Sequence, residues 1–271
     1  MNRKFIGLLT RCKDEFFIKE FCDYYLSQGV DMIYIIDDDS NDKSIYHSLH
    51  NNNKIRIIYE KDIMDRDIAS DIYKKIKDNF IWMIFVDVDE FITTKKNLKN
   101  TIRQELETTF KNNDCIKIPW VMMGCNNIQK NPESILKTNI YRWNHNKKHP
   151  HPVYKFRCRY WNIEVKCIFK TNKFNDIHEH NPIEPLSKQI SIVDSIKKKK
   201  QELRNHYPKL REKNIHNGYL LCYHYRIISR ENSENKLKNN KMYKEHKYTI
   251  DDLMKSDYSE IIDETLKNKI P

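Results

Sequence analysis

The chain has 271 residues, of which 39% are apolar, so it is long enough to form one large α/β domain with a substantial core. Its formal net charge is +11, but Lys is abundant together with Asn and Ile, as AT-rich codons would produce, so charge alone does not predict nucleic-acid binding. No stretch reaches the ~20 apolar residues that a membrane span requires, and the N-terminus reads as a first strand rather than a signal peptide. We therefore expect a cytoplasmic protein with no membrane span and no specific nucleic-acid partner.

The cysteines and glycines exclude several kinds of site. Seven cysteines, an odd number with no CxxC pair, indicate reduced and mostly buried thiols and argue against a structural zinc site. Only four glycines occur, at positions 7, 29, 124 and 218. The GxGxxG dinucleotide turn and the GxxxxGK[ST] phosphate loop both need several glycines close together, so neither is present. A bound phosphate would therefore be held mainly by a metal ion and by side chains.

The first ninety residues predict strands that alternate with helices. The predicted strands are Phe5–Thr10, Met32–Ile36, Ile55–Tyr59 and Phe80–Val86. The last of these runs is apolar on both alternating faces, as expected of a strand buried between helix layers. Strands separated by helices need right-handed crossover connections, so we predict a mostly parallel sheet.

Three helices are predicted between these strands. The first is capped by Asp14 and stops at Gly29, and it carries four aromatic side chains on one face: Phe17, Phe21, Tyr24 and Tyr25. The second runs from Ser40 to about His50 and the third from Ile68 to Lys77.

After Asp114 the pattern changes to strands or hairpins without clear helices between them. The predicted strands are Ile116–Met123, Thr138–Trp143, Tyr154–Trp161, Val165–Thr171 and Leu220–Ile228. Residues 195–215 are strongly basic and are predicted to form a solvated helix or loop. From about Glu231 the chain is highly charged, which predicts peripheral helices.

The sharpest chemical feature is the pair of acids Asp87 and Asp89 at the end of the most buried predicted strand. In a strand, residues i and i+2 face the same side, so the two carboxylates would project together. Ligands of open α/β sheets bind beyond the carboxyl ends of strands, and paired carboxylates there suit Mn²⁺ or Mg²⁺. The alternative interpretation is a solvated strand end with helix-capping acids.

A second acidic run, residues 37–42, ends the second predicted strand. It is interpreted either as a turn with Ser40 as the N-cap of the next helix, or as a carboxylate that accepts hydrogen bonds from a base or ribose. The second interpretation follows because two strand ends of one sheet would meet at the same cleft.

These residues carry a family resemblance. The segment LTRCKDEFFIKEFCDYYLSQGVDMIYIIDDDSNDKS is similar to the opening of family 2-like and family 92-like glycosyltransferases, and Asp37, Ser40 and Asp42 fit their D-x-x-S-x-D pattern. Further matches follow in the same order over roughly residues 5–240: Trp82, Asp87, Asp89, Glu90 and Phe91; Trp120 and Gly124; Lys166, His178, His180 and Pro182; and His224 to Arg226.

The resemblance implies a GT-A fold. We expect one domain over residues 1–230, with a nucleotide-binding half at 1–92 and a mixed acceptor half at 93–230, followed by a charged helical extension at 231–271. It also implies that a sugar moves from a nucleotide-sugar donor, expected to be a UDP-sugar, onto a glycan, protein or small-molecule acceptor.

The same resemblance assigns site residues. Asp89, together with Asp87, would hold Mn²⁺ (or Mg²⁺) against the donor diphosphate, and a late histidine would be a third ligand, with His178 placed slightly ahead of His224. Thr10, Arg11 and Asp37 would contact the base and ribose, Arg66 is a further candidate, and Arg226 and Lys166 could bind phosphate.

The catalytic base stays open at this stage. An inverting transferase, which the family 92 resemblance favours over a retaining one, needs a carboxylate within reach of the acceptor hydroxyl. Asp176, Glu179 and Glu133 are available, and their spacing does not separate them. The alternative functions are a D-x-D phosphohydrolase and a non-enzymatic module, either a basic binding domain or an inactive relative.

Overall fold

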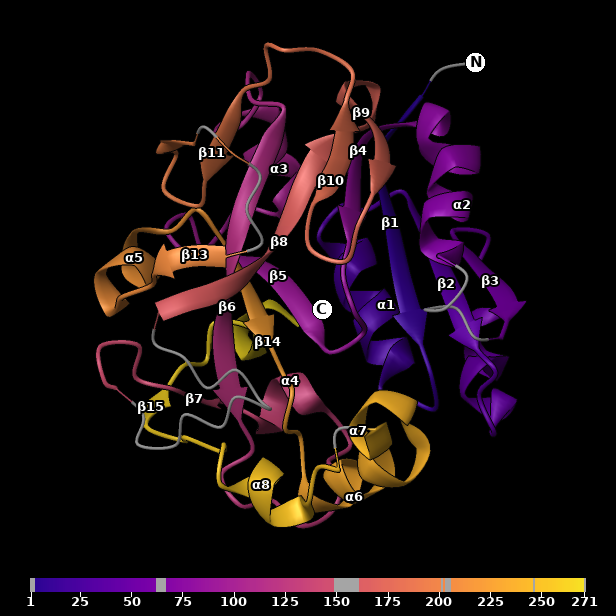
Figure 1. Cartoon of the computed structure of the whole chain (residues 1–271), viewed down its shortest axis with the longest axis vertical. Coiled ribbons are helices and arrows are strands. Elements are labelled where there is room, and N and C mark those ends of the chain that lie inside the picture. Colours follow the sequence, from indigo (N-terminus) through magenta and orange to yellow (C-terminus); the bar gives the residue numbers. More distant parts are fainter. Residues whose placement is uncertain are drawn as a thin grey trace.

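The computed structural model shown in Figure 1 describes residues 3–61, 67–148, 161–200, 202, 206–245 and 247–270. The candidate Arg66 and residues 154–160 of one predicted strand lie outside the described residues. Within the described ranges, no helix is long and apolar enough to cross a membrane.

The N-terminal part of the sheet is parallel, which confirms the prediction. Its strands are β1 (Lys4–Cys12), β2 (Met32–Asp38), β3 (Ile55–Glu60) and β4 (Phe80–Phe85), in the order β4-β1-β2-β3. Gly7 lies opposite Met32 on one side and Met83 on the other. A Cβ at Gly7 would meet the Phe80 ring at 2.8 Å, so the close approach of Phe80 to β1 requires glycine. The carboxyl ends of the four strands meet at one edge of the sheet.

Helices connect these strands at the expected places. They are α1 (Ile18–Ser27), the 3-10 helix η1 (Lys43–Leu49), α2 (Ile68–Ile76) and the short 3-10 helix η2 (Lys77–Asn79). The predicted apolar face of α1 is confirmed, because Phe21, Tyr24 and Tyr25 are buried. Gly29 follows α1 with a φ of 90°, a conformation that glycine adopts at low cost.

The predicted N-cap of α1 is wrong. Asp14 has a φ of 54°, and its carboxylate accepts hydrogen bonds from the backbone N–H groups of Asn41 and Asp42 at 2.7 and 3.2 Å. The N-cap is Phe17, which makes no side-chain capping bond. Asp14 instead ties the turn after β1 to the turn after β2, so the ends of these two strands are fixed to each other.

The C-terminal part of the sheet is mixed and continues the N-terminal part. Its elements up to residue 224 are β5 (Glu90–Thr94), α3 (Ile102–Glu107), β6 (Cys115–Gly124), α4 (Ile135–Thr138), β7 (Tyr141–Arg142), β8 (Trp161–Lys170), η4 (Thr171–Lys173), β9 (Phe174–Ile177), β10 (Pro182–Pro185), β11 (Ile192–Asp194), β12 (Lys199–Lys200), β13 (His206–Lys209), α5 (Glu212–Asn217) and β14 (Leu220–His224). Strand β8 runs antiparallel between β4 and β6, so strands of both predicted halves belong to one sheet.

Helix α1 packs against β5 through aromatic rings. Phe91 of β5 contacts the rings of Phe21, Tyr24 and Tyr25 at centroid distances of 5.6, 5.4 and 6.2 Å. The Tyr24 and Tyr25 hydroxyls donate to the backbone carbonyls of Ile92 and Glu90, each at 2.8 Å. Both phenol groups are therefore partnered inside the core, and they fix the start of β5 and the turn before it.

The last forty residues form α6 (Arg230–Asn239), α7 (Lys241–Glu245), α8 (Ile250–Met254), β15 (Ile261–Ile262) and the 3-10 helix η5 (Lys267–Lys269). In Figure 1, α6, α7 and α8 gather at the end of the molecule toward which the arrows of β1, β2 and β6 point. The helical part of this segment therefore lies toward the carboxyl ends of these strands. The domain boundaries at residues 92 and 230 stay predictions.

Candidate active site

The acids Asp87 and Asp89 lie in the tight turn between β4 and β5. The Glu90 N–H donates to the Asp87 carbonyl at 3.0 Å, and the Asp87 N–H donates to Glu90 Oε2 at 2.7 Å. The prediction that the two acids extend a strand is wrong, because β4 ends at Phe85. As a consequence of the turn, the two carboxylates contact different partners.

Asp87 is held by two cations, one from β1 and one from β8. Arg11 donates to Oδ1 through Nε at 3.2 Å and Nη2 at 2.7 Å, and Lys166 Nζ donates to Oδ2 at 2.9 Å. Burial acts to raise the pKa of Asp87, but Arg11 and Lys166 hold that pKa well below its usual range. Asp87 is therefore ionised, and its side chain is 33% exposed.

Asp89 faces β14 and α6. Its Oδ1 lies 3.6 Å from His224 Nε2, and its Oδ2 accepts from Lys236 Nζ at 3.0 Å. Its backbone carbonyl accepts from the Tyr225 N–H at 2.8 Å, which fixes the turn to the end of β14. Burial opposes ionisation, yet Lys236 and His224 hold the pKa of Asp89 well below its usual range.

Lys236 also reaches a second acid. Its Nζ lies 3.6 Å from Glu15 Oε1, and its side chain is only 12% exposed. Glu15 belongs to the polar turn after β1, so Lys236 joins that turn to the turn after β4. The prediction that the C-terminal helices are peripheral needs correction for α6, because this helix places a buried ammonium group at the acidic turn.

Glu90 lies behind the turn and is fully buried. Its Oε2 lies 3.2 Å from Lys166 Nζ, and its Oε1 has no hydrogen-bond partner among the described residues. Burial raises the pKa of Glu90 to about 8, although Lys166 acts in the opposite direction. Lys166 Nζ therefore lies between two acids, Asp87 at 2.9 Å and Glu90 at 3.2 Å.

Of the two predicted histidine ligands, His224 lies beside Asp89. Burial lowers the pKa of His224, so the imidazole is neutral, which is the form that binds metals. Its Nδ1 is buried without a hydrogen-bond partner in the described ranges. His178 is exposed in the loop after β9, and no contact described for it is with Asp87 or Asp89.

Asp89 and His224 fit a site for Mn²⁺ or Mg²⁺. A carboxylate oxygen and a neutral imidazole nitrogen 3.6 Å apart can both contact one ion, and Mn²⁺ accepts both ligand types. Among the residues that the structure describes, no group of three or more His, Cys, Asp or Glu side chains is placed to hold a metal. Donor phosphates and water would therefore have to complete the coordination.

The other predicted nucleotide-binding residues have different environments. Thr10 is fully buried in β1. Asp37 is also fully buried, and its oxygens accept from the Tyr46 hydroxyl at 2.6 Å and the Ser40 N–H at 3.2 Å. The guanidinium carbon of Arg226 lies 5.9 Å from the centre of the Tyr243 ring. The assignment of Thr10, Asp37 and Arg226 to the donor stays a prediction.

The three candidate bases are now separated by position. Glu179 Oε1 lies 3.3 Å from Arg11 Nη1, and its backbone carbonyl accepts from Lys166 Nζ at 2.9 Å. Asp176 is engaged elsewhere, since Lys74 contacts it at 2.6 Å, and Glu133 is exposed. Glu179 is therefore the candidate that shares its cations with Asp87.

Sequence reasoning missed the roles of Glu15 and Lys236. Glu15 carried a usable signal, because it lies shortly after the first predicted strand, in the segment that resembles the opening of the family. Lys236 is one of several lysines in a charged segment, and no spacing pattern singles it out from them.

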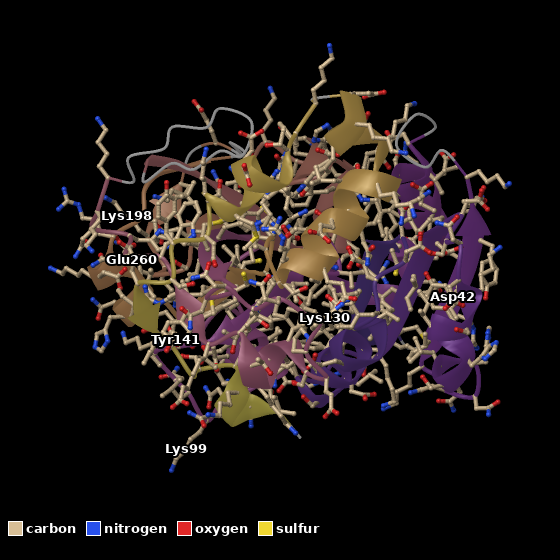
Figure 2. All side chains as sticks on the ribbon, turned by 90° about the horizontal axis from the view of Figure 1, so that it is seen from below. Asp42, Lys99, Lys130, Tyr141, Lys198 and Glu260 are labelled. Atoms are coloured by element: carbon tan, nitrogen blue, oxygen red, sulfur yellow. The ribbon has the colours of Figure 1, made fainter. Side chains whose placement is uncertain are left out.

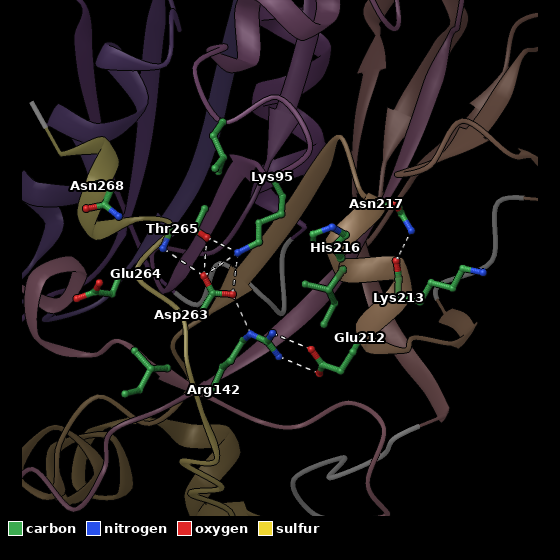
Figure 3. A pocket seen from close by; sticks show the side chains of 13 residues that line it. Lys95, Arg142, Glu212, Lys213, His216, Asn217, Asp263, Glu264, Thr265 and Asn268 are labelled. Atoms are coloured by element: carbon green, nitrogen blue, oxygen red, sulfur yellow. Dashed lines mark hydrogen bonds and ion pairs between the residues drawn. The ribbon is translucent and has the colours of Figure 1, made fainter.

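A cavity of about 640 Å³ lies away from this turn, near the opposite end of β5 (Figure 3). Its lining includes Lys95, Arg142, Glu212 and Asp263. These side chains are paired with one another, and the cavity contains none of the predicted site residues.

The parallel N-terminal sheet and its mixed continuation define a mixed α/β fold with a largely parallel central sheet, and the acidic turn lies after β4. The model of glycosyltransferase family 92 matches residues 15–259, and the chain belongs to this family. The match covers the acidic turn, His224 and Lys236.

The solved structures that this chain resembles are only distantly similar to it. TarS of S. aureus (residues 1–349) is 15% identical over 62% of this chain and 47% of that chain, with a TM-score of 0.34. TarS in complex with UDP-GlcNAc is 18% identical over 49% of this chain and 38% of that chain, with a TM-score of 0.32. The chain thus spans less than half the length of TarS.

A third structure is similar to a comparable degree. The 4-diphosphocytidyl-2C-methyl-D-erythritol synthase of Anaerococcus prevotii DSM 20548 is 9% identical over 78% of this chain and 95% of that chain, with a TM-score of 0.35. Among curated proteins, none matches the chain in sequence.

Proposed function

We propose that this chain transfers a sugar from a UDP-sugar donor to an acceptor hydroxyl, with inversion and with Mn²⁺ or Mg²⁺ as cofactor. The observation that carries the proposal is the meeting of Asp89 and His224, in the same turn in which Arg11 and Lys166 hold Asp87, at the carboxyl edge of the parallel strands. This is the edge at which α/β folds of this kind bind their ligands.

The division of roles follows from the contacts. Asp89 and neutral His224 would hold the metal ion, which when bound supplies a Lewis acid against the negative charge that develops on the leaving nucleotide. Arg11 and Lys166 hold Asp87 ionised and in one orientation, and they add positive charge where the donor diphosphate would lie. Asp87 is then available to accept a hydrogen bond from the donor.

Glu179 is proposed as the base that accepts the proton of the acceptor hydroxyl. Its side chain is 37% exposed, so an acceptor can approach it, and Arg11 holds its carboxylate near the acidic turn. The Trp120 ring lies beside this region, 5.5 Å from the ring of His180 and 4.2 Å from that of His224.

A binding screen tests the proposed reaction class. The protein is titrated calorimetrically with UDP, with and without Mn²⁺, and then with a phosphomonoester and with a nucleic-acid oligomer. We expect Mn²⁺-dependent binding of UDP and slow Mn²⁺-dependent hydrolysis of a UDP-sugar. Metal-independent preference for the phosphomonoester, or binding of the oligomer alone, would reject the transferase proposal.

A matched pair of variants tests the base. We expect Glu179→Gln to lower turnover by ~10²-fold or more, because the amide cannot accept the proton, while UDP affinity stays at the parent value. Glu133→Gln, at an exposed position, serves as the control and should keep parental turnover. If Glu179→Gln turns over like its control, another residue is the base.

A further inference from the structure

The C-terminal helix α6 supplies a cation to the acidic turn. Lys236 Nζ lies 3.0 Å from Asp89 Oδ2 and 3.6 Å from Glu15 Oε1. The two carboxylates come from different turns, one after β1 and one after β4, and their side chains are 16% and 17% exposed. A single ammonium group therefore compensates two largely buried acids.

Glu15 has little else to compensate its charge. Its carboxylate also accepts from Asn232 Nδ2, at 3.4 Å from Oε2, and burial raises the pKa of Glu15. The carboxylates of Glu15 and Asp89 both contact Lys236 Nζ in a largely water-excluded place, and they would repel each other without a cation between them. Lys236 thus does for Glu15 and Asp89 what a bound metal ion does for a pair of acidic ligands.

A divalent ion and this ammonium group compete for the same carboxylate. An ion on Asp89 would lie within a few ångströms of Lys236 Nζ, where little water screens the repulsion between two positive charges. Lysine can respond without unfolding the helix, because its charge sits at the end of a flexible four-carbon stem. The first turn of α6 is anchored by Ser229, Asn232 and Ser233, which are buried, whereas Glu234, Asn235 and Lys238, further along the helix, are exposed.

We propose that Lys236 is an exchangeable counter-cation of the active site, which neutralises Asp89 and Glu15 in the metal-free protein and leaves Asp89 when a divalent metal binds. The inference rests on the proposed function, since it takes Asp89 as a metal ligand. In this proposal, metal binding and the position of the Lys236 side chain are coupled in one equilibrium. The lysine of α6 therefore weakens metal binding, and its position changes when the metal binds.

Metal titration of a charge-deleted variant tests the competition. Lys236→Met keeps an unbranched apolar stem and removes the charge, and Lys238→Met makes the same change at an exposed position of α6. With Mn²⁺ alone as the probe, we expect Lys236→Met to bind about tenfold more tightly than the parent, because the metal no longer displaces a cation. The Lys238 variant should bind like the parent, and equal affinity in all three proteins overturns the inference.

Chemical labelling of the unmodified protein provides a test that needs no variant. Brief acetylation followed by peptide mass spectrometry measures how accessible each lysine is, with Lys238 as the internal reference. Lys236 should be protected in metal-free protein and should become several-fold more reactive when Mn²⁺ and UDP are added. If Mn²⁺ binds but Lys236 stays protected, the inference is wrong while the proposed function stands. If Mn²⁺ binds to neither the parent nor Lys236→Met, the metal dependence in the proposed function fails, and the exchange fails with it.

Discussion

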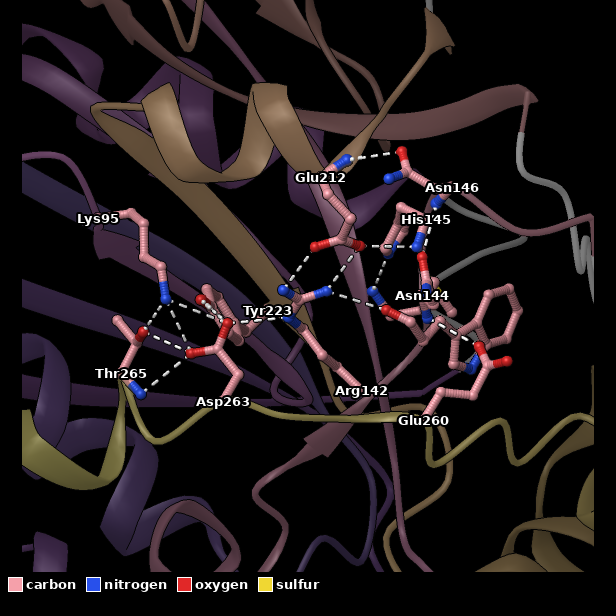
Figure 4. Close-up of polar contacts among 12 residues, drawn as sticks. Lys95, Arg142, Asn144, His145, Asn146, Glu212, Tyr223, Glu260, Asp263 and Thr265 are labelled. Atoms are coloured by element: carbon pink, nitrogen blue, oxygen red, sulfur yellow. Dashed lines mark hydrogen bonds and ion pairs between the residues drawn. The ribbon is translucent and has the colours of Figure 1, made fainter.

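Charged side chains gather at both ends of β5, and the two groups are partnered in different ways. The turn cluster, before β5, consists of Arg11, Glu15, Asp87, Asp89, Lys166, His224 and Lys236. The Arg142 cluster, beyond the other end of β5, consists of Lys95, Arg142, Glu212, Tyr223, Asp263 and Thr265 (Figure 4). Both contain buried ions, so burial of charge alone does not distinguish them.

Each charged side chain of the Arg142 cluster is paired with another member of the cluster. Arg142 binds Glu212 through Nη1 and Nη2 at 2.9 and 2.7 Å and Asp263 through Nε at 2.8 Å. Lys95 contacts Asp263 at 3.0 Å, and the Tyr223 hydroxyl donates to it at 3.0 Å. These bonds join the C-terminal segment to β5, β7 and α5, so the cluster serves to hold the chain end on the sheet.

The turn cluster differs from the Arg142 cluster in the hydrogen bonding of its buried polar atoms. Glu90 Oε1, next to it, and His224 Nδ1, within it, are buried without a hydrogen-bond partner among the described residues, whereas no side-chain atom of the six Arg142-cluster residues is in that condition. Buried groups left without partners cost stability, and a bound ligand can supply the missing partner. The comparison supports the proposed placement of catalysis in the turn cluster, and it favours a role in stability for the Arg142 cluster.

The largest expected effect comes from Asp89→Asn, which removes one charge from the turn cluster. We expect turnover to fall by ~10²–10³-fold, together with loss of Mn²⁺-dependent UDP binding, because an amide is a poor ligand for a hard cation. Folding should change by only ~1 kcal/mol, since Lys236 keeps Glu15 as a partner. Steady-state kinetics and calorimetry with and without Mn²⁺ measure both; parental metal-dependent affinity would contradict the site as described.

The same substitution in the Arg142 cluster should act on stability instead. Asp263 is almost fully buried, with a side chain that is 3% exposed. Asp263→Asn should destabilise the fold by about 3 kcal/mol, because it leaves the Lys95 charge without its carboxylate and weakens the hold on Arg142. Turnover per folded molecule should stay within a few-fold of the parent. Urea unfolding and steady-state kinetics on Asp89→Asn and Asp263→Asn measure both effects. If Asp263→Asn loses turnover without losing stability, the roles assigned to the two clusters are wrong.

Acid should reduce the difference between the parent and Asp263→Asn. Burial acts to raise the pKa of Asp263, but Thr265, Lys95 and Arg142 lower it to about 2. An acid with a depressed folded pKa stabilises the protein above its unfolded value of ~3.9, and this contribution is lost as pH falls toward 2. The stability difference between the two proteins should therefore shrink by up to ~2 kcal/mol between pH 4 and pH 2. Parallel urea titrations across that range measure it, and a constant difference would show that the Asp263 charge contributes nothing.

Local patterns predicted the N-terminal half of the fold well. Alternating apolar runs and aromatic spacing located the parallel strands, from β1 to β4, and the buried face of α1. Helix α3 was missed although Thr101 and Gln104 form a capping box, a signal visible in the sequence but overlooked because the helix has only one turn and a half. The Asp14 cap was wrong because its side chain satisfies a neighbouring turn rather than its own helix.

The site could be predicted only in part, for a physical reason. Their spacing identifies Asp87 and Asp89 as candidates in the sequence, and a motif identifies His224. Pairing between Lys236 and Glu15 joins positions more than two hundred residues apart, so only the folded sheet brings them together. The turn geometry that separates the two aspartates depends on Glu90, whose buried carboxyl caps the Asp87 N–H, and periodicity carries no information about such a contact.

The smallest expected effect concerns the basic run at residues 197–200, which the sequence predicts to lie outside the site. Lys200 pairs with Asp194 at 2.9 Å, and Lys199 and Lys200 form the short edge strand β12. In Figure 2, Lys198 and Asp42 lie at opposite edges of the molecule, so the run is remote from the carboxyl end of β2, and nitrogen and oxygen side-chain ends are mixed around the outline. The run also lacks the interleaved aromatic residues of a single-strand nucleic-acid platform.

Replacing the four lysines with Gln should therefore leave donor hydrolysis within a few-fold of the parent and leave the Mn²⁺ dependence unchanged, as kinetics at fixed ionic strength would measure. Complete loss of turnover in a folded quadruple variant would place the reaction away from the turn cluster and would remove the basis of the comparison.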